Sequence, residues 1–215
     1  PGEPDAQSIA DAAQLISESK KPVFYVGGGV IKSNASAELK ELAEKVGAPV
    51  VTTLMALGAF PDSHRQHLGM PGMHGSVSAV TALQKADLLI TLGARFDDRV
   101  TGKLSSFAPK ARVIHVDIDP TETQKFKGKN YNIDVKPLLK LLNEFGTSIK
   151  LDIQPWVDYC NKMKAEYPLV MPEHLTDPTN LAYKLESNWN IGQSLVDGNL
   201  TLDVVVNPFN QLDDD

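Results

Sequence analysis

Cysteine is nearly absent from this sequence, because Cys160 is the only one among 215 residues. An internal disulfide and a metal site built from several thiolates are therefore both excluded. Cys160 lies within PWVDYCNKMKAEYPL, where Trp156, Val157 and Met163 share its helical spacing. We expect a half-buried helical cysteine in core or linker packing, with a nucleophilic thiol as the alternative.

Long apolar runs are also lacking, since no segment approaches the roughly 20 residues that a helix needs to cross a bilayer. The first residues, PGEPDAQSIADA, show neither the basic nor the apolar region of a secretory signal. We therefore expect a cytoplasmic protein, or a fragment of one, without a membrane partner.

Basic stripes interleaved with aromatic residues are missing as well, which argues against a nucleic-acid partner. The net charge of −6 is unevenly distributed: residues 172–215 carry eight acidic side chains and one basic side chain, so the other residues together are near +1. We expect 172–215 to be a solvated acidic tail of unassigned role, in which NLTLDVVVNPF is suited to form a strand.

What the sequence does contain is a regular alternation of short apolar runs and amphipathic segments. Strands are expected at 23–26, 49–53, 87–93, 112–119 and 132–135. Helices are expected at 5–19, at 34–47 with Asn34 or Ser36 as N-cap and Gly47 as stop, at 76–85 and at 138–145. The alternation predicts an α/β fold, a Rossmann-like three-layer domain with a mostly parallel, doubly wound sheet of about six strands.

The ends of these strands carry the residue types of a nucleotide site, and ligands of such sheets bind at the carboxyl ends of the strands. Glycines let amides approach a phosphate, threonine donates to it, arginine neutralises it, and a carboxylate binds ribose or adenine. The alternative is that each glycine segment is only a turn. The segments are Gly27-Gly28-Gly29, Thr52-Thr53-Leu54, Gly93-Ala94-Arg95 and Asp117-Ile118-Asp119.

A standard NAD dehydrogenase is disfavoured by the same segments. GGGVIKSN lacks the third glycine of G-x-G-x-x-G, and the second strand ends in threonines rather than in an acid. The histidines His64, His67, His74 and His115 follow no ligand spacing, so no metal site is expected.

Five longer segments carry a family resemblance: YVGGGVI (25–31), PVVTTLMALGAFPDSH (49–64), HLGMPGMHG (67–75), TLGARFDDRVTGKLSSFAP (91–109) and IHVDIDP (114–120). Together they resemble the catalytic large subunit of acetohydroxyacid synthase, also called acetolactate synthase, and cover the central domain of this thiamine-diphosphate enzyme. The likeness extends over residues 1–171. GARFDDRVTGK is its most specific string, whereas the glycine triplet alone is weak.

The resemblance implies a transferase of branched-chain amino-acid biosynthesis that condenses two 2-ketoacids, pyruvate with pyruvate or 2-ketobutyrate, with decarboxylation. It implies FAD in a largely non-redox role on this domain, with thiamine diphosphate and Mg²⁺ in the complete enzyme. The activating glutamate and the metal-binding motif belong to other domains of the family, and neither motif is found here. The isolated chain is therefore predicted to be inactive.

The domain boundaries follow the resemblance. Residues 1–154 are expected to form the central, FAD-cradling domain, 155–171 a linker-like helix, and 172–215 the acidic tail. The expected partners are the pyrimidine- and diphosphate-binding domains of the parent enzyme, further copies in a homo-oligomer, and small 2-ketoacids. Two alternatives remain: a non-catalytic nucleotide-binding or oligomerisation module of the same fold, and an NAD-binding protein of related topology.

Carried over residue by residue, the resemblance implies eighteen cofactor-binding positions. They are Gly28, Gly29, Thr53, Leu54, Met55, Leu68, Gly69, Met73, His74, Gly75, Gly93, Arg95, Asp97, Arg99, Val100, Asp117, Ile118 and Asp134. Asp134 departs from the family pattern, because Ile133 stands where the family has glycine.

Three positions are further implied to contact substrate. Arg99 would bind the carboxylate of the incoming 2-ketoacid, since a guanidinium takes a carboxylate bidentately. Met73 and Asp98 match positions along the channel to the active site. The alternatives are loop packing for Met73 and a surface salt bridge or helix cap for Asp98. No catalytic residue is expected in this chain.

Overall fold

A five-stranded, all-parallel sheet forms the centre of the computed structural model, which describes residues 6–125, 128–145 and 151–168. The strands are β1 (Pro22–Val26), β2 (Val50–Thr52), β3 (Leu88–Leu92), β4 (Arg112–Val116) and β5 (Lys129–Tyr131), in the order β2-β1-β3-β4-β5. Every residue of β1, β2 and β3 is buried, as expected for strands covered on both faces. The α/β class and the parallel sheet are confirmed, with five strands among the described residues instead of about six.

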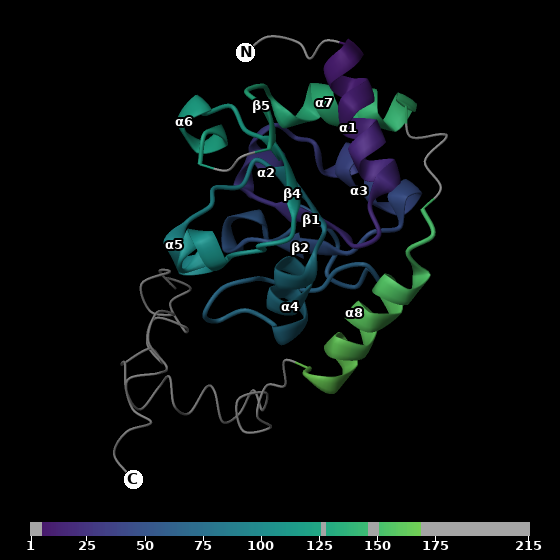
Figure 1. Ribbon diagram of the computed structural model, residues 1–215, viewed down its shortest axis with the longest axis vertical. Helices are drawn as coiled ribbons and strands as arrows, with labels where there is room; N and C mark the ends of the chain where they lie inside the picture. The colour runs from purple at the N-terminus through teal and green to yellow at the C-terminus, as the bar shows by residue number, and fades with distance from the viewer. Residues whose placement is uncertain (1–5, 126–127, 146–150, 169–215) are drawn as a thin grey trace, which may run out of the picture. The chain divides into compact units, whose positions relative to one another are not determined.

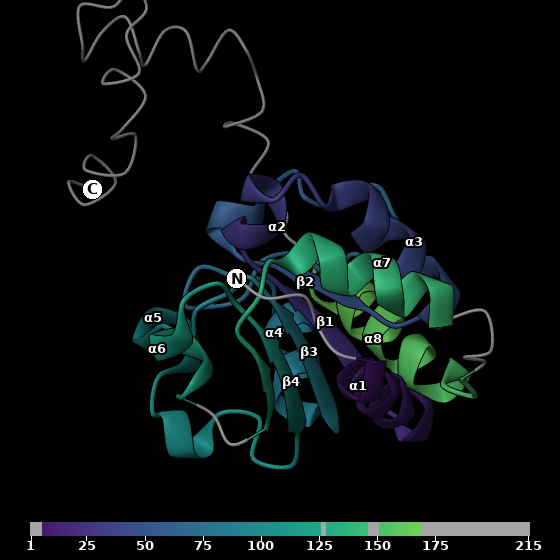
Figure 2. The same cartoon turned by 90° about the horizontal axis from the view of Figure 1, so that it is seen from above.

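Two groups of helices cover the sheet (Figure 1). α1 (Ala6–Glu18), α3 (Ser36–Val46) and α7 (Val135–Phe145) pack together on one side, and Figure 2 shows α1 and α3 flanking α7. α4 (Val77–Lys85) and α8 (Gln154–Glu166) pack against each other on the other side. The apolar stripes of these helices close the core from both faces.

The chain changes direction across the sheet after β2. The connection from β1 through α3 leads outward to β2, whereas the connection from β2 through α4 returns to β3 on the other side of β1. The carboxyl ends of β1 and β3 therefore form the topological switch point, where doubly wound sheets bind ligands. Short elements follow the strand ends there: α2 (Gly28–Lys32), η1 (Leu54–Ala56), α5 (Asp98–Thr101), η2 (Leu104–Ser106) and α6 (Pro120–Thr123).

Two of the boundaries that differ from the sequence prediction have a local cause. The last strand, expected at 132–135, lies at Lys129–Tyr131, because Asp134 accepts a hydrogen bond from the amide of Lys136 (2.9 Å) and so begins α7 at Val135. α3 is capped by neither Asn34 nor Ser36. Its N-cap is Ala35, while Asn34 adopts the left-handed conformation (φ 51°). Gly47 ends α3 as predicted, with φ 76°.

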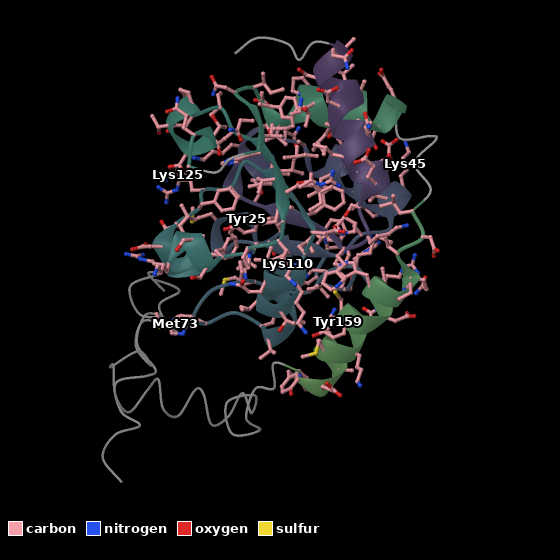
Figure 3. The ribbon with its side chains drawn as sticks, in the orientation of Figure 1. Tyr25, Lys45, Met73, Lys110, Lys125 and Tyr159 are labelled. Carbon is pink, nitrogen blue, oxygen red and sulfur yellow. The ribbon has the colours of Figure 1, made fainter. Side chains whose placement is uncertain are left out.

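The helix predicted to be linker-like, α8, is packed on the domain. Trp156 donates from Nε1 to the carbonyl of Pro22 (3.1 Å), and its ring stacks on Tyr159. The Lys85 ammonium of α4 in turn donates to the Tyr159 hydroxyl (2.6 Å; Tyr159 is labelled in Figure 3). Cys160 is fully buried, not half-buried, and burial raises its pKa to about 12, which removes the thiolate that a nucleophile needs.

Within the described ranges, no helix combines the length and apolar character of a membrane span. The acidic tail at 172–215 and its expected strand lie outside the described residues.

Candidate functional site

The carboxyl edge of the sheet brings together the four strand-end segments singled out in the sequence. Each first residue beyond a strand extends the ladder to a neighbour: the amides of Gly27, Thr53 and Gly93 donate to Leu92, Val26 and Val116 at 2.8–2.9 Å. Asp117 donates to Tyr131 in the same way (3.1 Å). The glycine turn, the threonine segment and the arginine loop therefore lie along one edge, not on opposite faces.

The glycine turn after β1 and the turn after β3 touch backbone to backbone. The amide of Gly29 donates to the carbonyl of Gly93 (3.0 Å). A Cβ added at Gly29 would lie 2.6 Å from the Cα of Gly93, and one added at Gly27 would lie 2.1 Å from its carbonyl oxygen. Gly27 makes the closest of these approaches. It was not among the predicted cofactor residues, although it belongs to the Gly27-Gly28-Gly29 segment that the sequence singled out. These glycines permit the close approach of the two loops.

Large apolar side chains stand exposed on this edge. Leu54 and Met55 follow β2 and are 65% and 73% exposed, and Ile118 after β4 is 61% exposed. The backbone and Cβ of Met55 lie directly beside Gly28, where an added Cβ would be 3.1–3.2 Å away. Exposed apolar residues gathered at a ligand edge indicate a surface that an apolar partner covers.

The loop after β3 presents two arginines. Asp97 accepts a hydrogen bond from the amide of Arg99 (3.0 Å) and so caps α5, and its other oxygen lies 3.7 Å from the Arg95 guanidinium. The Arg99 amide, a hydrogen bond with Asp98 and the nearby guanidinium charges lower the pKa of Asp97. The N-cap of α5 is therefore Asp97 and not Asp98, for which a helix cap was one of the alternatives. Arg95, Asp98 and Arg99 all remain exposed.

The long loop reaches the arginine loop through Gly72, because a Cβ added there would lie 3.2 Å from the carbonyl oxygen of Arg99. Next to Gly72, Met73 is 82% exposed, which excludes packing within the described loop (Figure 3). His74 is also exposed, while Gly69 and Gly75 are half-buried.

Leu68 differs from the other predicted cofactor residues of the long loop. Its side chain is buried, its amide donates to Val50, and its carbonyl accepts hydrogen bonds from Ser76 and Ser78. The sequence pattern did not distinguish this core position from its exposed neighbours.

The other two acids among the predicted cofactor residues, Asp117 and Asp134, each accept a backbone hydrogen bond with one oxygen, as Asp97 does. Asp117 accepts from the amide of Asp119 (2.9 Å), and Asp134 from the amide of Lys136 (2.9 Å). Asn132, which the sequence did not single out, donates to the carbonyls of Asp117 and Ile118. Val100, within α5, is half-buried.

Three histidines have partners inside the protein. His67 lies 2.9 Å from the Thr52 hydroxyl and 3.1 Å from Asp62, His64 contacts Glu44, and His115 contacts the carbonyl of Ala94. Burial lowers the pKa of His67 and of His115. Among the described residues, no group of three histidines, cysteines or acids is placed to hold a metal ion.

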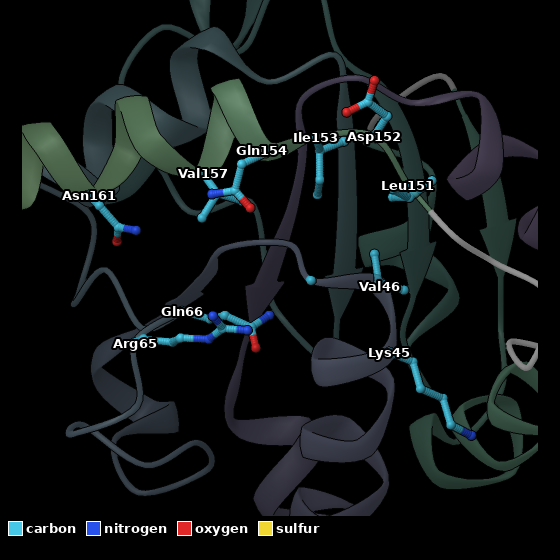
Figure 4. A pocket seen from close by; sticks show the side chains of 11 residues that line it. Lys45, Val46, Arg65, Gln66, Leu151, Asp152, Ile153, Gln154, Val157 and Asn161 are labelled. Carbon is cyan, nitrogen blue, oxygen red and sulfur yellow. The ribbon is translucent and has the colours of Figure 1, made fainter.

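A groove of about 410 Å³ lies elsewhere, at the amino end of the sheet (Figure 4). Gln154, Val157 and Asn161 of α8 face Arg65 and Gln66 across it, and Lys45 lies at its end. Figure 3 places Lys45 and Met73 on opposite sides of the domain. None of the predicted cofactor residues lines this groove. We therefore place the candidate site on the open carboxyl edge, where residue chemistry and topology coincide.

The fold and this edge are those of an α/β domain with a ligand site at the carboxyl ends of its strands. Comparison with known families identifies the family to which the chain belongs. Residues 9–142, more than half of the chain, match the family described as "Thiamine pyrophosphate enzyme, central domain", so the chain belongs to that family. The family resemblance predicted from the sequence is confirmed.

Several similar curated proteins carry the name acetolactate synthase. The Mycobacterium avium acetolactate synthase is 58% identical over an alignment of 172 residues that covers 77% of this chain and 28% of that protein. The Corynebacterium glutamicum large subunit is 56% identical over 77% of this chain and 27% of its own length. Acetolactate synthase 2 of Nicotiana tabacum is 46% identical, over 77% and 26%. The chain thus spans less than a third of these relatives.

Proposed function

We propose that this chain is the FAD-cradling central domain of a cytoplasmic acetolactate synthase, which condenses two 2-ketoacids with loss of carbon dioxide. The observation that carries the proposal is the exposed apolar set on both sides of the switch point, Leu54 and Met55 after β2 and Ile118 after β4, together with the glycine loops in backbone contact between them. Identity of 46–58% to acetolactate synthases supports the reaction class.

The residues of the edge fit FAD by their chemistry. The half-buried glycines leave backbone accessible, Arg95 and Arg99 offer guanidinium groups for a diphosphate, and Met55 and Ile118 offer apolar surface to flat rings. When bound, FAD supplies a rigid aromatic surface and, by the family resemblance, no net redox change. Arg99 would also orient the 2-ketoacid carboxylate, with Met73 and Asp98 along the approach.

Thiamine diphosphate and Mg²⁺ would be held by other domains of the complete enzyme, in a homo-oligomer. Purified chain with thiamine diphosphate and Mg²⁺ should therefore form no acetolactate from pyruvate. Product from rigorously pure chain would contradict this part of the proposal.

Flavin titration tests the binding role. FAD at about 100-fold over its Kd should stabilise the chain by roughly 2.7 kcal/mol, seen as a higher melting temperature together with a change in flavin fluorescence. NAD at the same concentration should do neither. A shift with NAD alone would favour an NAD-binding protein, and no shift with either would favour a non-catalytic module.

Met55→Gln sharpens this test, with Val80→Thr on the outer face of α4 as the matched control. Both side chains are exposed, so both variants should keep the parent stability within about 0.5 kcal/mol. Met55→Gln should weaken FAD binding roughly tenfold, because a methionine covered by ligand contributes about 1.5 kcal/mol. Equal FAD affinities of the two variants would mean that the flavin does not bind at this edge.

A further inference from the structure

A buried polar row crosses the centre of the sheet beneath the arginine loop. Tyr25 of β1, Thr91 of β3 and His115 of β4 are register partners in adjacent parallel strands, so their side chains share one face. All three are completely buried. Polar side chains in such a position are costly unless they bond, so their partners are informative.

Two members of the row hold consecutive backbone carbonyls of the arginine loop. Nε2 of His115 lies 3.0 Å from the carbonyl oxygen of Ala94, and the Tyr25 hydroxyl donates to the carbonyl of Arg95 (3.3 Å; Tyr25 is labelled in Figure 3). A carbonyl only accepts, so Nε2 of His115 carries the proton and Nδ1 does not in the neutral ring. Burial lowers the pKa of His115 and keeps the ring neutral.

The next residue of the loop is fixed by ring contacts. The Phe96 ring meets His115 edge to face, with centroids 5.0 Å apart, and lies 5.8 Å from the Tyr25 ring. Ala94 and Phe96 are buried, whereas the Arg95 side chain between them is 68% exposed. Because Ala94 and Phe96 are both buried in the core, the Arg95 side chain between them is directed out of it.

We propose that His115 and Tyr25 are positioning residues that set the backbone of residues 94–97 and thereby place Arg95, Asp97 and Arg99 at the edge. The link to Arg99 runs through Asp97, which caps α5. The inference rests on the proposed function only for the identity of the ligand. The positioning itself is a property of the folded chain.

Thr91 provides a matched control within the same row. Its hydroxyl is buried without a hydrogen-bond partner among the described residues, so Thr91→Val removes a polar group of the row without removing a bond to the loop. His115→Leu removes the donor to Ala94. His115→Gln keeps an amide N–H near the position of Nε2 and is the conservative rescue.

The experiment measures amide hydrogen exchange by NMR in the 215-residue chain, comparing residues 99–101, whose amides bond Asp97, with the centre of β3. His115→Leu should speed exchange at 99–101 roughly tenfold relative to β3, because a lost hydrogen bond of about 1.4 kcal/mol would release the backbone that places Asp97. His115→Gln and Thr91→Val should stay near the parent. If His115→Leu does not fold, Tyr25→Phe replaces it, with an expected increase of about threefold at the same amides.

FAD affinity gives a second readout. His115→Leu should raise the Kd roughly tenfold, with rescue by His115→Gln and no change in Thr91→Val. Exchange at 99–101 that is unchanged relative to β3 in the variant lacking the donor, or a failure of His115→Gln to rescue, would overturn the positioning role. A parent chain that binds no FAD would refute the proposed function, while the exchange comparison would still decide the positioning role.

Discussion

At the scale of single residues, the candidate site depends on glycines, because they have no side chain between the two loops. Gly27 and Gly29 face the backbone of Gly93 at distances that no Cβ tolerates. Gly28 is less constrained, since its nearest neighbour, the Met55 carbonyl, would be 3.1 Å from an added Cβ. The turn therefore tolerates substitution unequally at adjacent positions.

Gly29→Ala and Gly28→Ala test this inequality. Both residues lie in α2, where alanine is intrinsically preferred to glycine by about 0.8–1 kcal/mol. Gly29→Ala should nevertheless lower the free energy of unfolding by about 1–3 kcal/mol, because backbone must move. Gly28→Ala should stay within about 1 kcal/mol of the parent. Urea unfolding decides, and equal stability of the two variants would contradict the contact with Gly93.

The buried histidines make stability depend on pH. Burial is the largest cause of the lowered pKa of both His67 and His115. At His67, Asp62 raises the pKa, while Lys164 and His64 lower it further. At His115, the Ala94 carbonyl, Asp117 and Glu122 raise the pKa, while Lys125 lowers it further. Because each ring binds a proton more readily when unfolded, the folded state is favoured above about pH 6.5.

The free energy of unfolding should therefore fall as the pH is lowered through 6.5 toward the depressed folded pKa values. The slope should not exceed about 1.4 kcal/mol per pH unit for each histidine. Urea unfolding between pH 5.5 and 7.5 measures it, and His67→Gln and His115→Gln should each flatten the curve. The exposed His74→Gln is the matched control. A curve that keeps the parent slope in both buried variants would exclude these histidines as its source.

At the scale of helices and strands, the sequence predicted element type better than element ends. The apolar runs around β1, β3 and β4 are long enough to specify buried strands, and each was found within one to three residues. The β5–α7 boundary was missed because it is set by the Asp134 side chain bonding the Lys136 amide, a contact that competes with strand propensity. The N-cap of α3 was missed because Asn34 turns into the left-handed region instead.

α8 is the helix whose packing partners the sequence specified least. The sequence showed the helical spacing of α8, but that spacing does not identify the elements against which the helix packs. The partner is the start of β1, where the Trp156 indole bonds the Pro22 carbonyl, together with Lys85 of α4. A docked helix of this kind contributes to the stability of the domain.

Trp156→Ala should accordingly lower the free energy of unfolding by about 3–5 kcal/mol, the range for a buried aromatic truncation. Lys162→Ala, on the exposed face of the same helix, should change it by less than about 0.5 kcal/mol. Thermal and urea unfolding would measure both. Similar stabilities of the two variants would mean that α8 is dispensable for the folded domain.

At the scale of the whole domain, strand order decides where function lies. The order β2-β1-β3-β4-β5 places the glycine turn, the arginine loop and Asp117 along one edge, as the strand-end residues predicted. Side-chain exposure was beyond the sequence, because it depends on neighbours that are distant in the chain. Met73 is 82% exposed while Leu68, five residues earlier, is buried. The support of residues 94–97 by His115 and Tyr25 likewise emerges only from cross-strand register.

The most direct test of the central claim is a hydrogen-exchange footprint of the chain with and without saturating FAD. The account predicts slower exchange at residues 53–55, 72–75 and 93–100 along the carboxyl edge. Residues 45–47 and 151–161, around the groove at the other end of the sheet, should be unchanged. Protection confined to that groove, or no protection anywhere at saturating FAD, would contradict the account.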